Sequence, residues 1–326
     1  MTKLIHVAVG VIFDCSPDEK GKILIAKRAD HQHQGGLWEF PGGKVEEGES
    51  VQGALKRELE EELGLQSSTE NMQPLIKIPF HYPDKSVLLD VWSVYNGKMP
   101  ADHDEAVMIG KENQPLAWVD QNALAEYEFP AANKAILDAL SLPSQIAISQ
   151  DDARPERILS QVATTLKKHE GIWVQLRAPS VDQVQYTQLA MKLYGICHEA
   201  GSKLIWNCPL EWYQIAFADG LHLTSIRASA LKDVKRPIPD GQWLSMACHN
   251  LAELEVAQGM ADYVLVSPVH ETETHPQATA LTWSGFKNIA DQARIPCYAL
   301  GGLQKSELDY CIQIGGQGIA AIRSLQ

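Results

Sequence analysis

Apolar and polar positions follow an irregular pattern along the first part of the chain. Runs rich in Val, Ile, Leu and aromatic residues predict strands, and segments with an apolar residue every three to four positions predict helices. The predicted strands cover residues 4–13, 22–27, 74–80, 87–95 and 116–119, and the predicted helices cover residues 50–63 and 130–141. This irregular order of elements predicts an α+β fold with a mixed sheet.

The second part of the chain repeats one pattern eight times. Short apolar runs alternate with longer helix-like segments, which is typical of successive β/α units. The runs cover residues 145–149, 172–176, 203–206, 220–223, 242–246, 262–267, 296–300 and 318–322. A closed (β/α)8 barrel and an open, doubly wound parallel sheet both satisfy this pattern.

The two parts meet near Leu142-Pro143. The helical pattern stops there because Pro disfavours helix in the residue before it, and a new apolar run begins at Ile146. A length of 326 residues fits two domains at roughly 100–200 residues each. We therefore expect one domain over residues 1–142 and a second over residues 143–326.

Composition excludes several classes of protein. Hydrophobic residues make up 45% and charged residues 21% of the chain, and no apolar stretch is long enough to span a bilayer. The six Cys residues include no C-x-x-C pair, so we expect neither a disulfide framework nor a zinc site, and a cytoplasmic location. The net charge of −13 argues against binding to nucleic acid or to an anionic membrane. Most of this charge lies in residues 1–144, where 23 side chains are acidic and 13 are basic.

Carboxylates gather on one face of the first predicted helix. Glu58, Glu61 and Glu62 have the spacing i, i+3, i+4, with Ser50 as the expected N-cap and Gly64 as the expected stop. Three such carboxylates repel each other unless a cation lies between them. Mg²⁺ prefers oxygen ligands and bridges to substrate phosphates, so the pattern predicts a site for a phosphorylated ligand. A solvated acidic helix face is the alternative for the Glu-rich run alone.

The full pattern resembles the signature box of Nudix hydrolases. The segment GGKVEEGESVQGALKRELEEELGLQ meets every fixed position of G-x5-E-x7-R-E-U-x-E-E-x-G-U, where U is aliphatic. The resemblance implies an α/β/α sandwich with a mixed sheet. It also implies a Mg²⁺-dependent hydrolase, with Mn²⁺ as an alternative ion, that acts on a nucleoside diphosphate linked to another group. The implied metal ligands are Glu58, Glu61, Glu62 and the backbone carbonyl of Gly42, and the implied loop-fixing salt bridge joins Glu49 to Arg57.

Flanking segments resemble the 8-oxo-dGTP diphosphatase subfamily of these hydrolases. They are LWEFPGGKVEEGE (37–49) and FPAAN (129–133). The second resembles the segment with a purine-recognising Asn, here Asn133, whose amide can pair with a purine edge as donor and acceptor. A helix N-terminal residue after Pro130 is the alternative for Asn133. The substrate-binding residues implied by the resemblance are Lys27, Arg28, Phe40, Lys85 and Asn133.

Two positions bear on chemistry and selectivity. The segment GKENQP (110–115) resembles a loop that brings one more acidic residue to the metals, here Glu112. Glu112 and Glu58 are both candidates for the general base. At Lys85 the subfamily carries an Arg, and Lys lacks its bidentate fork, which weakens the expectation of strict 8-oxoguanine selectivity.

The subfamily implies a reaction and a biological role. An activated water attacks the β-phosphorus of 8-oxo-dGTP and releases 8-oxo-dGMP and pyrophosphate. Removing the oxidised nucleotide from the pool would serve DNA repair and the fidelity of DNA replication. The alternative is a role in thiamine metabolism, in which this domain cleaves analogues of thiamine pyrophosphate.

The second part resembles the thiamine-phosphate synthase and TenI-like family of (β/α)8 barrels. The matching segments, in family order, are VQLRAP (174–179), ADGLHLTS (218–225), ACHNLAEL (247–254), ADYVLVSPVHETETH (261–275) and IPCYALGGLQKSEL (295–308). The resemblance implies a TIM-type barrel with a site for a phosphorylated thiazole or pyrimidine. The chain stops at Gln326, soon after the eighth predicted strand, so we expect the last helix to be short or missing.

Candidate ligand-binding residues of the barrel follow its predicted strands, where barrel enzymes keep their sites. They are Arg177, Asn207, His249, Gly301 and Gly302, the glycines offering backbone N–H groups to a phosphate. A neutral His at a barrel mouth can relay protons near pH 7, and TenI-like tautomerases use a His in a segment like the one around His249.

Several groups of the synthase motif are replaced in this chain. The replacements are Pro179 and Ser180 at the family's Lys after Q-L-R-x, Cys208 at the Asp after Asn207, Ile226-Arg227-Ala228 where a metal-binding Asp is expected, and His275 at a Lys. Because metal and pyrophosphate groups are missing, we do not expect the coupling of a pyrimidine pyrophosphate to a thiazole phosphate. A tautomerase and a non-catalytic ligand-binding module remain as alternatives, either of them as a monomer or an oligomer.

Overall fold

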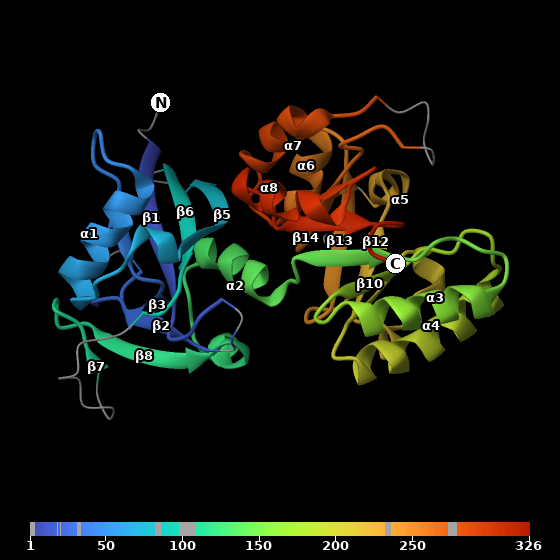
Figure 1. Ribbon diagram of the computed structural model, residues 1–326, viewed down its shortest axis with the longest axis horizontal. Coiled ribbons are helices and arrows are strands. Elements are labelled where there is room, and N and C mark those ends of the chain that lie inside the picture. Colours follow the sequence, from blue (N-terminus) through green and yellow to red (C-terminus); the bar gives the residue numbers. More distant parts are fainter. Residues whose placement is uncertain are drawn as a thin grey trace. The chain divides into compact units, whose positions relative to one another are not determined.

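A mixed sheet and a closed barrel form the two units of the chain in the computed structural model. The units are Met1–Ser141 and Leu142–Gln326 (Figure 1). The structure describes residues 4–17, 19, 21–30, 34–81, 86–97, 108–231, 236–272 and 279–326. In this part of the chain, no helix has the length and apolar character needed to cross a membrane.

The first unit has one sheet with both strand directions, as the sequence predicts. Its strands are β1 (Leu4–Phe13), β2 (Lys22–Lys27), β3 (Trp38–Glu39), β4 (Gly42–Lys44), β5 (Met72–His81), β6 (Ser86–Val94), β7 (Met108–Ile109) and β8 (Pro115–Asp120). They run in the order β5-β6-β1-β2-β8-β7, with β3 beside β2 and β4 beside β1. The pair β1–β6 is parallel, whereas β1–β2 and β5–β6 are antiparallel.

Helices cover both faces of this sheet (Figure 1). The helices of the unit are α1 (Val51–Leu63) and α2 (Lys134–Ser141), with the 3-10 turns η1 (Thr69–Asn71), η2 (Gln121–Glu126) and η3 (Ala131–Asn133). Ala8 and Ile12 of β1 pack in the core under α1, whereas Val9 and Val11 pack in the core under α2. Alternate residues of one strand therefore supply two cores, because side chains alternate across a strand.

The sequence predicted the ends of α1 more accurately than the start of α2. Ser50 caps α1 by accepting a hydrogen bond from the Gly53 N–H, and Gly64 ends it in the left-handed region at φ 70°. Both positions were predicted, and α1 is one residue shorter than expected. The second predicted helix starts too early, because residues 131–133 form the turn η3 after Pro130 and the α-helix begins at Lys134.

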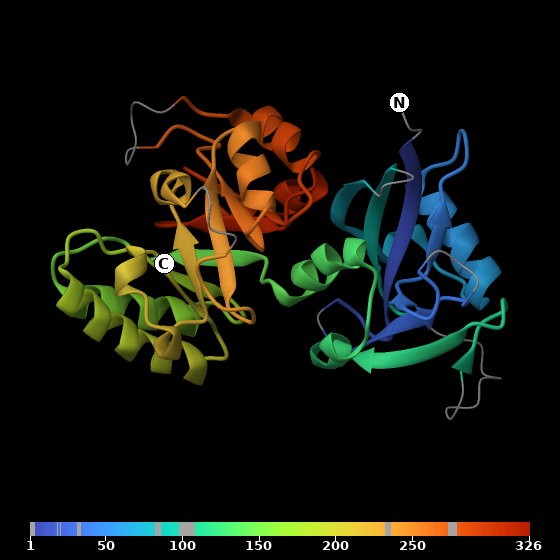
Figure 2. The same ribbon diagram turned by 180° about the vertical axis from the view of Figure 1, so that it is seen from behind.

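The second unit is a closed barrel of eight parallel strands, so the open-sheet alternative is wrong. Its strands are β9 (Gln145–Ile148), β10 (Trp173–Leu176), β11 (Leu204–Trp206), β12 (Gly220–Leu223), β13 (Trp243–Cys248), β14 (Tyr263–Val266), β15 (Cys297–Leu300) and β16 (Gly318–Ala321). Pairing of β16 with β9, in which Ala320 lies opposite Ile146, closes the ring. Helices lie around the outside of the strands (Figure 2).

The helices of the barrel alternate with its strands. They are α3 (Pro155–Lys168), α4 (Gln183–Glu199), α5 (Ser225–Ala230), α6 (Leu251–Gln258), α7 (Thr282–Ala290) and α8 (Leu308–Gln313), with the 3-10 turns η4 (Leu210–Trp212), η5 (Ile215–Phe217) and η6 (Lys305–Glu307). No helix follows β16 among residues 322–326, as the sequence predicts.

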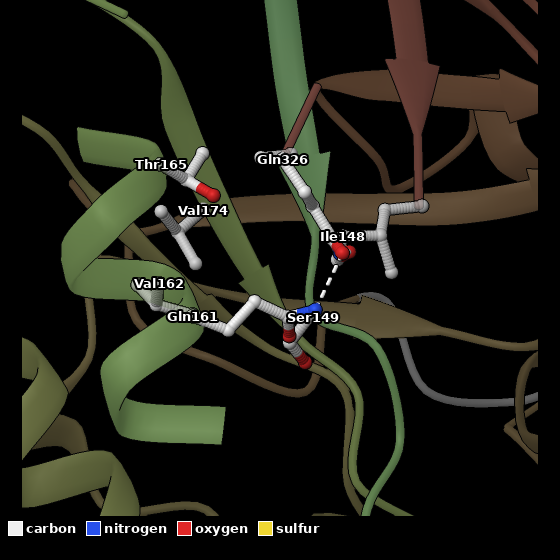
Figure 3. A pocket seen from close by; sticks show the side chains of 8 residues that line it. Ile148, Ser149, Gln161, Val162, Thr165, Val174 and Gln326 are labelled. Carbon is white, nitrogen blue, oxygen red and sulfur yellow. Dashed lines mark hydrogen bonds between the residues drawn. The ribbon is translucent and has the colours of Figure 1, made fainter. Parts of the chain in front are cut away.

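The last residue packs beside α3. The Gln326 side chain donates a hydrogen bond to the Ile148 carbonyl at 3.2 Å. It also accepts a hydrogen bond from the Gln161 side-chain amide (Figure 3). The cavity that these residues line has a volume of about 10 Å³, room for no more than a single water. A ligand site of the barrel must therefore lie elsewhere.

Among the described residues, the interior of the barrel holds one buried imidazole. His222 of β12 is 4% exposed, and its Nδ1 lies 2.9 Å from the Ser245 hydroxyl. Burial lowers the pKa of His222 to about 3, and the positive charges of Arg227 and His249 act in the same direction. The folded state therefore holds this ring neutral at pH values where an unfolded chain would protonate it.

This difference predicts acid destabilisation of the barrel. The folded pKa lies below the unfolded value of about 6.5, so the unfolded state binds the extra proton and stability falls as pH drops from about 6.5 toward 3. The expected loss from His222 is about 1.4 kcal/mol per pH unit in this window. Calorimetry at pH 7, 6 and 5 should show a weaker pH dependence of the barrel transition in His222→Asn, but not in a control with the exposed His81→Asn. Equal slopes in all three proteins would contradict the assignment.

Candidate functional site

Glu62 is the centre of a group of carboxylates at the end of α1. Burial raises the pKa of Glu62 to about 8, and the negative charges of Glu39, Glu112 and Glu58 add to the shift. The backbone N–H of Gly42 donates to Glu62 Oε2 at 3.3 Å. Three separate segments, namely α1, β3 and the loop before β8, thus bring carboxyl groups to one place.

Arg57 ties the loop before α1 to the helix. Its guanidinium donates to both carboxylate oxygens of Glu49, at 3.2 and 3.1 Å, and to the Lys44 carbonyl at 3.1 Å. It also donates to Glu58 at 2.8 Å and to Glu61 at 3.3 Å. These bonds lower the pKa of Glu49 and raise that of Arg57. The ion pair between Glu49 and Arg57 that the sequence motif implies is present.

Two glycines let the backbone approach β1 and the carboxylates. Gly42 has φ 149°, and a Cβ added to it would lie 2.1 Å from the Ala8 carbonyl oxygen. A Cβ added to Gly43 would lie 2.1 Å from the carboxyl carbon of Glu58. The first position excludes a side chain through backbone contact, whereas at the second a side chain would displace a candidate metal ligand.

The loop that carries Glu112 is fastened to the end of α1. The Lys111 N–H and the Gln114 side-chain amide donate to the Glu62 carbonyl at 2.8 and 3.2 Å. Lys111 Nζ donates to the Glu60 carbonyl at 2.9 Å. These donors satisfy carbonyl groups that a helix end leaves free. The sequence resemblance predicted a role for Glu112, but it did not predict that Lys111 and Gln114 position the loop.

The chemistry of this group fits a divalent cation. In the part of the chain that the structure describes, no three His, Cys, Asp or Glu side chains are already arranged as a metal centre. However, Glu62 has no basic partner among these residues, and its raised pKa reflects burial first and then the negative charges of three neighbouring carboxylates. A hard cation would neutralise these charges with the oxygen ligands it prefers. The residues that would hold it are Glu58, Glu61, Glu62 and Glu112.

Aromatic side chains gather beside β3 in the core under α2. The rings of Phe40 and Phe129 stack with centres 5.3 Å apart, and Trp38 meets Tyr127 edge-on at 5.3 Å. Asn133 ends η3 on the segment that carries Phe129 and is 8% exposed. Stacking surfaces and a paired donor and acceptor are the groups that a purine base requires.

The candidate phosphate-binding residues have partners of their own. Arg28 pairs with Glu39, which the sequence reasoning did not single out although it lies within the quoted segment before the helix. Lys27 Nζ lies 6.0 Å from the centre of the Trp38 ring. Lys85 lies outside the described residues.

Comparison with known proteins assigns both units. Residues 8–139 match the family model described as NUDIX domain, and residues 145–325 match the model described as thiamine monophosphate synthase. The second match covers more than half of the chain. The chain belongs to the Nudix hydrolases and to the thiamine monophosphate synthase family.

Three relatives illustrate the two parts. The Nudix unit is similar to the 8-oxo-dGTP diphosphatase of Escherichia coli, with 33% identity over 42% of this chain and 97% of that protein. It is also similar to the CTP pyrophosphohydrolase of E. coli, with 33% identity over 42% of this chain and 91% of that protein. The barrel is similar to the putative thiamine-phosphate synthase 2 of Aquifex aeolicus, with 29% identity over 56% of this chain and 97% of that protein. The first unit is thus a Nudix pyrophosphohydrolase domain.

Two polar side chains meet at the mouth of the synthase-like barrel. Arg227, in the first turn of α5, donates to the Asn207 side-chain oxygen at 3.0 Å. The Asn207 N–H donates to the Leu176 carbonyl at 3.0 Å and contacts the Tyr186 hydroxyl at 3.1 Å. The sequence motif named Asn207, and the structure adds Arg227 as its direct partner.

His249 is held by a neighbouring carboxylate. Its Nδ1 lies 2.8 Å from Glu253 Oε2 and 3.1 Å from the Ser225 hydroxyl. A carboxylate acceptor at Nδ1 fixes the proton there and leaves Nε2 as the accepting nitrogen. A cavity of about 210 Å³ adjoins this group, with Ser225, Glu253 and Val256 in its lining. The i, i+4 spacing of His249, just before α6, and Glu253, in the first turn of α6, was a signal that the sequence reasoning did not use.

Gly301 and Gly302 form a tight turn after β15. Their φ angles are 109° and 69°, a region that favours glycine. A Cβ added to Gly301 would lie 2.9 Å from Pro268, and one added to Gly302 would lie 2.9 Å from the His270 side chain. Close packing against the loop after β14 therefore explains both glycines, and the predicted phosphate contact stays a prediction.

Proposed function

We propose that the Nudix unit hydrolyses 8-oxo-dGTP to 8-oxo-dGMP and pyrophosphate with Mg²⁺ or Mn²⁺. The observation that carries the proposal is the relation to 8-oxo-dGTP diphosphatase over almost the whole length of the E. coli protein. The carboxylate group around Glu62 supports it, because a hydrolase of this kind needs a cation at the phosphates. The role would be removal of oxidised nucleotides in the cytoplasm, in support of DNA replication and repair.

Each group of residues has one task in this proposal. Glu58, Glu61, Glu62 and Glu112 would hold the ion, which lowers the charge barrier at the phosphates and on the departing pyrophosphate. Arg57 keeps the loop before α1 in place through Glu49. Glu58 and Glu112 are the two candidates for accepting the proton of the attacking water, the second from a loop fastened to the helix end.

Sequence identity alone does not decide which nucleobase the Nudix unit recognises, because the CTP pyrophosphohydrolase is as similar as the 8-oxo-dGTP diphosphatase. The substitution Asn133→Ala tests the recognition of the purine base. We expect kcat/KM for 8-oxo-dGTP to fall about ten- to hundredfold, because a buried donor and acceptor for the base edge are lost. The value for CTP should change little. Steady-state release of pyrophosphate measures both.

The matched control for this test is Asn122→Ala in η2. Asn122 is exposed, so its removal should leave both substrates unaffected. An Asn133→Ala protein that keeps its preference between 8-oxo-dGTP and CTP would remove the base-recognition role and weaken the nucleotide assignment.

The barrel is the basis of a second proposal. The observation that favours it is that, among the described residues, the contacts of Asn207 and Arg227 include no carboxylate. We propose that the barrel binds a phosphorylated thiazole or pyrimidine and does not couple a pyrimidine pyrophosphate to a thiazole phosphate. The orientation of His249 by Glu253 supports a proton-transfer step on the bound ligand.

A further inference from the structure

The barrel mouth does not fit a divalent cation. The synthase motif places a metal-binding Asp after β12, but the segment there carries Arg227, whose guanidinium hydrogen-bonds Asn207 at 3.0 Å. Cys208, at the other expected Asp, is 1% exposed. Burial raises the pKa of the Cys208 thiol to about 12, so it is neutral and no substitute for a carboxylate. A cation would meet a permanent positive charge at this place.

Two arginines of the mouth lack carboxylate partners. Elsewhere in the barrel, arginines pair with acidic side chains: Arg154 and Arg157 with Asp152, Arg236 with Asp262, and Arg294 with Glu255. Among the described residues, neither Arg177 nor Arg227 has a carboxylate within ion-pair distance, although both are half-buried. Their positive charges are therefore available to an anion.

Strand register brings these charges toward one corner of the mouth. Leu176 of β10 pairs with Trp206 of β11, and both pack outward against helices. Because side chains alternate along strands, Arg177 and Asn207, the next residues, start on the inner side of the barrel. Arg227 reaches the same Asn207 from α5. The two arginines thus follow β10 and β12, on either side of Asn207 after β11, at the C-terminal ends of the strands, where barrel ligands bind.

One buried polar atom below Arg177 lacks a partner. The Gln175 side chain is 2% exposed, and its Oε1 accepts no hydrogen bond among the described residues. Gln175 lies two residues before Arg177 on β10 and so on the same inner side. An unsatisfied buried acceptor is costly in a folded protein, which indicates that a polar group completes this region.

We infer that the barrel mouth binds the phosphate of a small organic phosphate directly on Arg227 and Arg177, without a divalent cation. The charge reversal from Asp to Arg replaces the indirect contact through a metal by a direct, charge-assisted hydrogen bond to the phosphate oxygens. This inference rests on the ligand-binding role proposed for the barrel, and it adds which residues bind and that no metal takes part.

The test is calorimetric titration of the full chain with two probes, hydroxyethylthiazole phosphate and inorganic phosphate, in EDTA and in Mg²⁺. We expect the organic phosphate to bind equally in both buffers and more tightly than inorganic phosphate. Arg227→Gln and Arg177→Gln should each weaken its binding about ten- to hundredfold, since each removes a hydrogen bond to a charged group. Arg294→Gln is the control, because Arg294 lies before β15, at the opposite end of the barrel, and should not change binding.

The outcomes separate the two proposals. Binding that requires Mg²⁺, or that survives both mouth substitutions, would overturn the metal-free site but keep the ligand-binding role. Equal binding of both probes would overturn the assignment of an organic phosphate as the ligand and leave free phosphate as the ligand of the two arginines. If neither probe binds, both proposals are overturned. Should one variant unfold at the assay temperature, the other decides, because the two arginines lie on different elements.

Discussion

Replacing Glu62 by Gln is expected to lower kcat for 8-oxo-dGTP hydrolysis about a thousandfold, because several kcal/mol of charge stabilisation by the metal are lost. Glu62 is the buried centre of the carboxylate group, and no basic side chain of the described residues pairs with it. Gln keeps the size of the side chain and an oxygen that can accept the Gly42 N–H. The fold should therefore persist. Pyrophosphate release and the Mg²⁺ concentration at half-maximal rate measure the effect.

Glu47→Gln is the matched control for this experiment. Glu47 lies exposed in the loop before α1, two residues from Glu49, so its loss should leave turnover unchanged. A thermal melt without metal should show Glu62→Gln at least as stable as the parent protein, since Gln removes the cost of burying an ionisable carboxyl beside other carboxylates. Turnover within a few-fold of the parent, at an unchanged Mg²⁺ requirement, would remove Glu62 from the proposed metal site.

Gly43→Ala should separate activity from stability. The added Cβ would meet the carboxyl carbon of Glu58 at 2.1 Å, and Glu58 can turn away because its carboxyl group ends a flexible side chain. The backbone at Gly43 does not require a positive φ, so the substitution should change the free energy of unfolding by less than about 1 kcal/mol. A displaced ligand should nevertheless lower kcat about a hundredfold.

Gly42→Ala is the contrasting substitution one residue earlier. There the added Cβ would meet the backbone oxygen of Ala8 at 2.1 Å, with φ at 149°, so β4 could not keep its place beside β1. We expect the free energy of unfolding to fall by several kcal/mol, because the strain of a non-glycine residue at this φ adds to the steric clash with the backbone. Denaturant unfolding of both variants provides the comparison. Equal losses of stability would show that the two glycines serve one structural purpose.

Long periodic segments were predictable from the apolar pattern, whereas closure of the barrel was predicted only by the resemblance to the thiamine-phosphate synthase family. β1 and β2 have the expected bounds because their apolar runs are continuous. β3, β4 and β7 were missed, since two or three residues show no periodicity. The eight runs of the second part fitted an open sheet as well. Only the pairing of β16 with β9, distant in sequence, decides for the barrel.

The resemblance to the Nudix box predicted the parts of the site that lie within one motif. The ion pair of Glu49 with Arg57 is one of them. Contacts between distant segments could not be derived in this way. They include Glu39 near Glu62, Lys111 on the Glu60 carbonyl, and Arg227 on Asn207. Each depends on how separate elements pack, which residue spacing does not encode.

One comparison of substrates tests the central claim most directly. The full chain with Mg²⁺ is assayed on 8-oxo-dGTP, dGTP, CTP and thiamine pyrophosphate, with separation of the products. We predict the highest kcat/KM for 8-oxo-dGTP, with 8-oxo-dGMP and pyrophosphate as products and loss of turnover in Glu62→Gln. Faster cleavage of thiamine pyrophosphate than of any nucleotide would contradict the account and place the Nudix unit in thiamine metabolism together with its barrel.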